Sequence, residues 1–313
     1  MDISVVVPTF NRREIVSRTL NTLFAQDFPA SRYEIIVVDG STDGTAAALK
    51  SLTPRCRLRV IEQENRGPSA ARNTGYRAAQ APLVLFLDDD MFCDPGLVVA
   101  HVAAHKDHDR CVAFGALFLS DDSPPSIAAE CFNREIGAFH LRQRSDPSAK
   151  WQESDCVFAN ASLSRELLER LGGFDEKFRM REDLELGVRL FTAGVQPRYV
   201  SNAICYQHYE KTSADLIRDA EMFAVADVQF ARKHPEAQIQ GHLSWLEKEP
   251  RWKQTIRSFA ASSPAFEVCF LAPLCNLGQK FFRVPALRNM GVRALQIRRQ
   301  FHWLRVVRRL TTS

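Results

Sequence analysis

Three features are missing from this sequence of 313 residues. Its eight cysteines form no Cys-X-X-Cys pair, so we interpret them as reduced, buried thiols rather than as zinc ligands or a disulfide framework. No apolar run reaches the ~20 residues that a membrane-spanning helix needs, because the densest stretch, 264–282, contains Glu267 and Lys280. The chain enters an apolar stretch at Ile3 without a basic leader, so no secretory signal is predicted. We therefore expect a cytoplasmic protein.

Acidic residues are almost absent from 251–313, where Glu267 is the only one. The formal net charge of the whole chain is +4, and its positive excess lies in this segment. The basic residues there are Arg251, Lys253, Arg257, Lys280, Arg283, Arg288, Arg293, Arg298, Arg299, Arg305, Arg308 and Arg309. The aromatic residues that interleave with them from 245 onwards include Trp252, Phe259, Phe266, Phe270, Phe281, Phe282, Phe301 and Trp303.

This basic and aromatic pattern is typical of helices that bind an anionic membrane surface without crossing it. We expect 245–313 to make such a contact on the inner face of the cell membrane. The alternative is a pair of solvated helices that close the preceding domain. We expect no nucleic-acid partner, although the same composition occurs in nucleic-acid-binding proteins.

The length and composition suit a large α/β domain with an appended module. Hydrophobic residues make up 45% of the chain and charged residues 25%, so a sizeable core can form. Continuous apolar runs alternate with helical patterns through the first part of the chain. The runs predict buried strands over Ile3–Pro8, Glu34–Asp39, Leu58–Ile61 and Leu83–Leu87. This alternation predicts a mostly parallel sheet with helices on both faces.

The pattern after Pro95 is less regular. It indicates strands over 112–119 and 198–206, and helices over 127–141, 163–171, 181–193 and 214–233. We predict a domain over 1–240, with halves 1–94 and 95–240, followed by a helical segment over 241–313.

Acidic side chains stand where two of the predicted strands end. Asp39 ends one strand, and Asp88, Asp89 and Asp90 follow another. Ligands of such sheets bind beyond the carboxyl ends of the strands, so we expect these acids to converge on one crevice. Adjacent carboxylates repel one another unless a cation is present, and oxygen ligands suit Mg²⁺ or Mn²⁺. A solvated acidic turn is the alternative for an isolated acid run.

Two later segments add candidate residues. Glu182 and Asp183 open a predicted helix, where acids also occur simply because they complement the helix dipole. His208 follows the last predicted strand, and a lone histidine there is more often structural than a metal ligand.

Six motifs in order, spanning about 1–210, closely resemble the family 2 glycosyltransferases, which have the GT-A fold. They are Val5-Val6-Val7-Pro8-Thr9-Phe10-Asn11-Arg12, Val37-Val38-Asp39-Gly40-Ser41-Thr42-Asp43-Gly44-Thr45, Asn65-Arg66-Gly67-Pro68-Ser69-Ala70-Ala71-Arg72-Asn73-Thr74-Gly75, Phe86-Leu87-Asp88-Asp89-Asp90, Gly173-Phe174-Asp175-Glu176 and Glu182-Asp183. In one departure, a single acid, Asp39, stands where the family usually has Asp-Asp before the glycine.

The resemblance implies a role for each matching residue. Asp88 and Asp90 match the DxD motif that holds a divalent metal, and His208 lies where some members supply a further metal contact. Asp183 matches the catalytic base, with Glu182 beside it. The resemblance also implies that the nucleotide sugar is bound by Pro8, Thr9, Asn11, Asp39, Arg72, Asp88 and Asp89.

The resemblance also implies a reaction. An inverting glycosyltransferase would transfer a sugar from a nucleotide-diphosphate sugar to a hydroxyl of a cell-surface polysaccharide or lipid-linked glycan precursor. One displacement needs one base, unlike the carboxylate pair of a double-displacement glycosidase. A nucleotidyltransferase that makes nucleotide sugars is an alternative, but its usual glycine-rich loop is missing from Thr9–Arg13. A non-catalytic nucleotide-sugar binder is the other alternative, and the acids at 88, 90 and 183 argue against it.

Overall fold

The computed structural model describes the chain except for residues 109, 147–149, 153–154, 236–260 and 313. The chain forms two compact units, one of 1–121 with 138–208 and one of 122–137 with 209–313. The predicted boundary between 240 and 241 lies outside the described residues.

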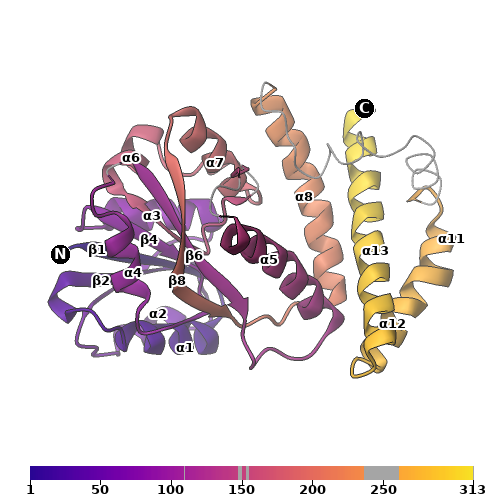
Figure 1. Cartoon of the computed structure of the whole chain (residues 1–313), viewed down its shortest axis with the longest axis horizontal. Helices are drawn as coiled ribbons and strands as arrows, with labels where there is room; N and C mark the ends of the chain where they lie inside the picture. Colours follow the sequence, from indigo (N-terminus) through magenta and orange to yellow (C-terminus); the bar gives the residue numbers. More distant parts are fainter. Residues whose placement is uncertain (109, 147–149, 153–154, 236–260, 313) are drawn as a thin grey trace. The chain divides into compact units, whose positions relative to one another are not determined.

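The first unit is built on an eight-stranded sheet in the order β3-β2-β1-β4-β7-β6-β8-β5 (Figure 1). Its strands are β1 (Ile3–Thr9), β2 (Tyr33–Asp39), β3 (Arg57–Glu62), β4 (Leu83–Leu87), β5 (Met91–Cys93), β6 (Cys111–Leu119), β7 (Asn160–Ser164) and β8 (Gln196–Gln207). Four of the seven pairings in the described sheet are parallel, which confirms the predicted mostly parallel α/β architecture.

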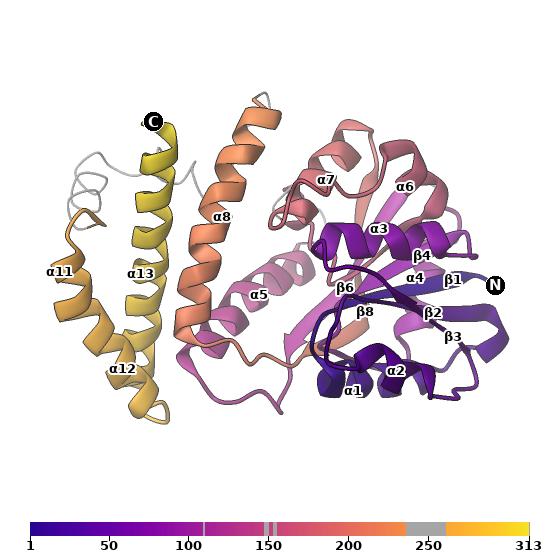
Figure 2. The ribbon, with the colours of Figure 1, turned by 180° about the vertical axis from the view of Figure 1, so that it is seen from behind.

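Helices cover both faces of this sheet. Figures 1 and 2 show α3, α6 and α7 on one side and α1 and α2 on the other. The helices of this unit are α1 (Arg13–Phe24), the 3₁₀ turn η1 (Ala30–Arg32), α2 (Thr45–Lys50), α3 (Pro68–Ala78), α4 (Leu97–Ala104), α6 (Arg165–Leu171) and α7 (Glu182–Thr192). Close packing of α3 on β1 requires Gly75, because a Cβ there would lie 2.2 Å from Val6 Cγ1.

One predicted helix boundary was wrong. The sequence predicted a helix over 163–171, but 160–164 form β7, which pairs antiparallel with β4. The helix begins only at Arg165, because Ser164 is its N-cap and accepts a hydrogen bond from Leu167 N at 3.1 Å. The short strand β5 and helix α4 were not predicted. β5 has only three residues, which give no detectable periodicity.

The second unit is helical. It contains the start of α5 (Ile127–Ser145), then α8 (Ser213–Lys233), α11 (Pro264–Phe266), the π-helical turn η3 (Glu267–Leu271), α12 (Ala272–Lys280) and α13 (Pro285–Thr311). The long helix α13 lies beside α8 and α12 (Figures 1 and 2). No described helix combines the length and apolar character needed to cross a bilayer.

Candidate active site

The acid run lies in the turn between β4 and β5. β4 is held by β1 and β7, and β5 by β8, so the turn is fixed from both sides. Asp88 keeps about a third of its side chain exposed (32%), whereas Asp89 and Asp90 are buried. Two of the three carboxylates therefore need partners within the protein.

Asp89 receives hydrogen bonds from Thr9 and Arg12. Thr9 Oγ1 donates to Asp89 Oδ2 at 2.7 Å, and Arg12 Nη1 donates to Asp89 Oδ1 at 2.6 Å. Burial raises the pKa of Asp89 to about 7, although the positive charge of Arg12 opposes that shift. The end of β1 and the acid run are thus joined.

Arg12 also contacts Asp90, since its Nη2 donates to Asp90 Oδ2 at 3.1 Å. Sequence reasoning assigned no role to Arg12, although it lies in the same Thr-Phe-Asn-Arg turn as two of the candidates. Burial raises the pKa of Asp90 as well, and Arg12 again opposes the shift. A cation beside this pair of acids therefore stabilises their charged forms.

The end of β8 completes the surroundings of Asp90. Gln207, which the sequence analysis did not select, donates from Nε2 to both carboxylate oxygens at 3.3 Å. The His208 backbone N–H donates to the Asp90 carbonyl at 2.9 Å, and its buried ring packs against Phe92. Within the described residues, no three His, Cys, Asp or Glu side chains form a group that could hold a metal ion. The predicted ligands Asp88, Asp90 and His208 therefore lie next to the ends of β4, β5 and β8, but in the described structure they do not form a three-ligand metal site.

Asp39 is the last residue of β2 and pairs with Thr9, the last residue of β1. The preceding residues, Val38 and Pro8, pair in the same parallel register. It is buried, and its Oδ1 accepts a hydrogen bond from Ser41 N at 2.9 Å. Its Oδ2 is buried without a hydrogen-bond partner. A buried acceptor left unpaired at a strand end is suited to an N–H donor from a ligand.

Asn11 shapes the loop beside Asp39. It adopts φ 52°, a left-handed conformation that asparagine tolerates better than most residues. Its backbone N–H donates to Ser41 Oγ at 2.7 Å, and its Oδ1 accepts from Thr42 N at 2.9 Å. Asn11 therefore ties the β1 loop to the β2 loop while it stays exposed.

Arg72 on α3 links the acid run to α7. Its buried guanidinium donates from Nη2 to Asp88 Oδ1 and from Nη1 to Glu182 Oε1, both at 2.8 Å. Nη1 also lies 3.6 Å from Asp183 Oδ1. Three carboxylates from two distant motifs thus share one buried cation, so the residues predicted to act together do lie together.

Asp183 lies in the first turn of α7, which follows Arg181 in a left-handed conformation at φ 66°. Asp183 Oδ2 accepts a hydrogen bond from Phe158 N at 2.9 Å, while a quarter of the side chain (24%) stays exposed. Burial raises the pKa of Asp183 to about 7, against the opposing charge of Arg72. A carboxylate with a pKa near neutrality is well matched to removing a proton from a hydroxyl.

The comparison with protein families identifies the family of this chain. Residues 4–172, more than half of the chain, match the glycosyl transferase family 2. The chain belongs to glycosyl transferase family 2. The match covers four of the six motifs that carried the resemblance, and the motifs at 173–176 and 182–183 lie beyond it.

Curated relatives agree with this family assignment. The chain is 31% identical over 262 residues to a validoxylamine A glucosyltransferase of Streptomyces hygroscopicus, covering 74% of this chain and 61% of the relative. It is 28% identical over 257 residues to a pre-mycofactocin glycosyltransferase of Mycobacterium tuberculosis, covering 75% and 48%. The family 2 chain thus spans about half to three fifths of the length of these relatives.

Solved structures share the fold. A mannosyltransferase of Pyrobaculum calidifontis in complex with GDP-Man and Mn²⁺ superimposes with a TM-score of 0.62 at 23% identity, covering 95% of this chain and 85% of that one. TarS of Staphylococcus aureus, residues 1–349 with UDP, gives 0.56 at 18% identity, covering 100% and 92%. These likenesses confirm the predicted GT-A fold.

Proposed function

We propose that this family 2 protein transfers a sugar from a nucleotide-diphosphate sugar to an acceptor hydroxyl, with inversion at the anomeric carbon. The observation that carries the proposal is the Arg72 cluster, which joins Asp88 of the acid run to Asp183 of α7. The proposed donor-binding residue, Asp88, and the proposed base, Asp183, contact different nitrogens of one buried guanidinium.

The donor nucleotide would lie across the ends of β1 and β2. The unpaired Asp39 Oδ2 would accept a hydrogen bond from an N–H of the base, which would satisfy its buried lone pair. Thr9 and Pro8 would line the same strand edge, and Asn11 would hold the loop beside it. GDP-Man and UDP in the two related structures are donors or products of this chemical class.

The acid run fits a divalent cation, Mn²⁺ or Mg²⁺, because its donors are carboxylate oxygens. Asp88 and Asp90 would hold the ion, with His208 at the adjoining end of β8, while Asp89 stays bound to Thr9. The bound ion would stabilise the negative charge of the departing diphosphate. Arg12 is 37% exposed at its side chain, so it can turn from Asp90 toward that diphosphate.

Asp183 would accept the proton of the acceptor hydroxyl at Oδ1, because Oδ2 already binds Phe158 N and Oδ1 is a buried oxygen without a hydrogen-bond partner. Its pKa near 7 leaves it partly ionised at neutral pH, and Arg72 favours the ionised form. Glu182 would hold Arg72 in place rather than take the proton, because its Oε1 already accepts from Arg72 Nη1 at 2.8 Å. One base and one displacement invert the anomeric centre.

A panel of nucleotide sugars tests this function. Release of nucleoside diphosphate, measured with a simple acceptor glycan in Mn²⁺ and in EDTA, should occur with one donor and only with metal. Asp90→Ala should abolish the release, while the exposed control Asp121→Ala should not change it. Full activity in EDTA, or in Asp90→Ala, would contradict the metal role. Nucleotide-sugar synthesis from a sugar phosphate would favour the nucleotidyltransferase alternative.

The acceptor proposed from the sequence is a lipid-linked or cell-surface glycan precursor, which would place the enzyme at a membrane surface. The structure changes which residues could make that contact. Phe301 and Trp303 of α13 are buried, and Trp303 Nε1 donates to Asp227 at 2.8 Å. Arg298 and Arg305 bind Glu267. The stretch that the sequence singled out, 298–305, is therefore largely internal.

A different face of the same segment is exposed and apolar. Phe266 and Phe270 stack on each other, and Leu277 and Phe281 follow on an exposed side of the same helical run, which includes the π-helical turn η3. They are between 36% and 60% exposed. The exposed cations Lys280 and Arg283 lie at the end of this side. We call these six residues the interfacial face.

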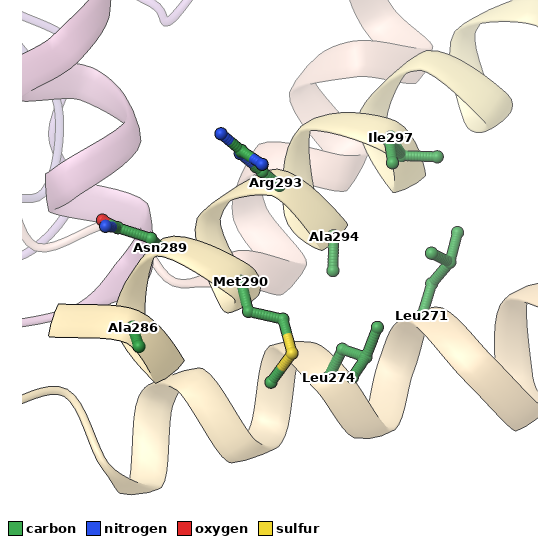
Figure 3. Close-up of a pocket in the computed structure, with 8 residues that line it drawn as sticks. All are labelled: Leu271, Leu274, Ala286, Asn289, Met290, Arg293, Ala294 and Ile297. Atoms are coloured by element: carbon green, nitrogen blue, oxygen red, sulfur yellow. The ribbon is translucent and has the colours of Figure 1, made fainter. Parts of the chain in front are cut away.

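A groove between α12 and α13 adds apolar surface in the same unit. Its volume is about 390 Å³. Figure 3 shows the lining side chains Leu271, Leu274, Ala286, Asn289, Met290, Arg293, Ala294 and Ile297. Apolar side chains flanked by cations fit shallow binding to anionic lipid, and like charges would repel a second copy of the same face.

A further inference from the structure

Two cysteines face each other across the outermost strand pair. β5 pairs antiparallel with β8, and Cys93 is directly opposite Cys205. Hydrogen bonds flank this position, from Asp94 N to Ile204 O at 3.0 Å and from His208 N to Asp90 O at 2.9 Å. Alternation along an antiparallel ladder then makes Cys93 and Cys205 a non-hydrogen-bonded pair. The Cys93 N–H confirms this, because it donates to Thr22 Oγ1 of α1 instead of to β8.

This kind of pair brings two side chains closest together. Opposite Cα atoms in a non-hydrogen-bonded pair are about 4.5 Å apart, within the range that disulfides span. The two Sγ atoms lie 3.2 Å apart, and both residues are buried. Neither strand has to shift register for the sulfurs to bond.

A shared metal ion explains the pair less well. Two thiolates on one tetrahedral zinc, each about 2.3 Å from it, would hold their sulfurs about 3.8 Å apart. The part of the chain that the structure describes offers no third His, Cys, Asp or Glu to complete such a site.

We propose that Cys93 and Cys205 are a modification site, oxidised to a cross-strand disulfide by a small peroxide. Cys93 is 8% exposed and Cys205 is fully buried, so the peroxide attacks Cys93 first. Hydrogen peroxide converts the Cys93 thiol to a sulfenic acid and one water is formed. The Cys205 sulfur then displaces the sulfenic hydroxyl as a second water, which forms the S–S bond. A dithiol reductant reverses the reaction by exchange.

The bond would join β5, which begins directly after the acid run, to β8, which ends at Gln207 beside Asp90. In the described sheet, β5 has β8 as its only strand neighbour and is three residues long. Cys93 follows Asp90 by three residues, and Cys205 precedes His208 by three. The cross-link would close a loop between positions 112 residues apart, so it should restrict the unfolded chain strongly.

Peptide mapping of the full chain tests the site. The exposed Cys269 is first replaced in a Cys269→Ser background to prevent cross-linking between molecules. Hydrogen peroxide under native conditions should lower the intact mass by two hydrogens and yield one peptide pair joining Cys93 to Cys205. The oxidised protein should melt about 5–10 °C above the reduced protein, and a dithiol should reverse both changes.

Matched variants separate this bond from general oxidation. Cys93→Ala should lose the mass change and the melting shift, whereas Cys56→Ser, at another buried cysteine, should keep both. Mapping of the unsubstituted protein gives the answer even if Cys93→Ala fails to fold. Oxidation that joins other cysteines, or that joins Cys93 to Cys205 only in urea, would overturn the proposal.

Discussion

The two oxygens of Asp183 have different neighbours. Oδ2 binds Phe158 N, and Oδ1 lies 3.6 Å from a charged nitrogen of Arg72. We expect Asp183→Asn to keep the shape of this site and remove the base. Turnover should fall by a factor on the order of 10²–10⁴ while donor affinity changes little.

Steady-state kinetics and donor binding measured on the same preparations check this prediction. Glu166→Gln is a suitable control, because it removes an exposed first-turn acid from another helix, α6. Normal turnover with weak donor binding would show that Asp183 contacts the nucleotide. A product with the donor's own anomeric configuration would contradict single displacement.

The raised pKa of Asp183 predicts a pH dependence. The ionised carboxylate is the active form, so kcat/KM should fall tenfold per pH unit below about 7 and level off above it. Burial also raises the pKa of Asp89 to about 7, so the two acids must be distinguished. In Asp89→Asn the acid limb should remain, and in Asp183→Asn it should disappear. The opposite result would assign the limb to Asp89.

Glu267 connects η3 to α13 and shows why the tail is part of the folded unit. Its buried carboxylate accepts hydrogen bonds from Arg298, His302 and Arg305 at 2.7–3.0 Å. Glu267→Gln should lower the free energy of unfolding by about 3–5 kcal/mol, since it leaves a cluster of cations without their counter-charge. Glu135→Gln on α5, whose acid is half exposed and pairs with Arg299, should cost at most about 1 kcal/mol.

The sign of the pH effect is fixed by the pKa of Glu267. Burial raises that pKa, but the hydrogen bonds from His302, Arg305 and Arg298 lower it further, to below its usual value of 4.5. The stabilisation is therefore present above about pH 4.5 and is lost as the pH falls through the folded-state pKa. Denaturant unfolding at pH 7 and pH 3 should show the difference between wild type and Glu267→Gln shrinking at pH 3.

At the scale of the whole molecule, the interfacial face predicts peripheral membrane binding. The full chain should co-sediment with anionic vesicles, detach in 1 M salt, where screening acts over about 3 Å, and ignore neutral vesicles. Burying a phenylalanine is worth roughly 1.5–3 kcal/mol, so Phe270→Glu with Phe281→Glu should reduce binding on the order of tenfold or more.

Leu141→Glu provides the matched control for vesicle binding, because Leu141 is 70% exposed but lies on α5 outside this face. Equal loss in both variants would mean that added negative charge, rather than the interfacial face, weakens binding. Unchanged binding of the double variant would contradict membrane contact through α11–α12.

The sequence by itself determined the fold class and most of the candidate site. Buried strands such as β1 and β4 are continuous apolar runs, and the motifs that follow them are local in sequence. Parallel strands bring their carboxyl ends together whatever the details, so Asp39 and Asp88 could be placed at one edge of the sheet from their positions alone.

Only the tertiary structure decided which partner each polar side chain takes. Arg12 binds Asp89 and Asp90 across nearly 80 positions, and Gln207 of the adjacent strand β8 reaches Asp90 across 117 positions. In the tail, the sequence pattern of arginines and aromatics at 298–305 would be the same whether these side chains faced lipid or bound Glu267. Burial settles that choice, because it depends on which helix packs against each face of α13.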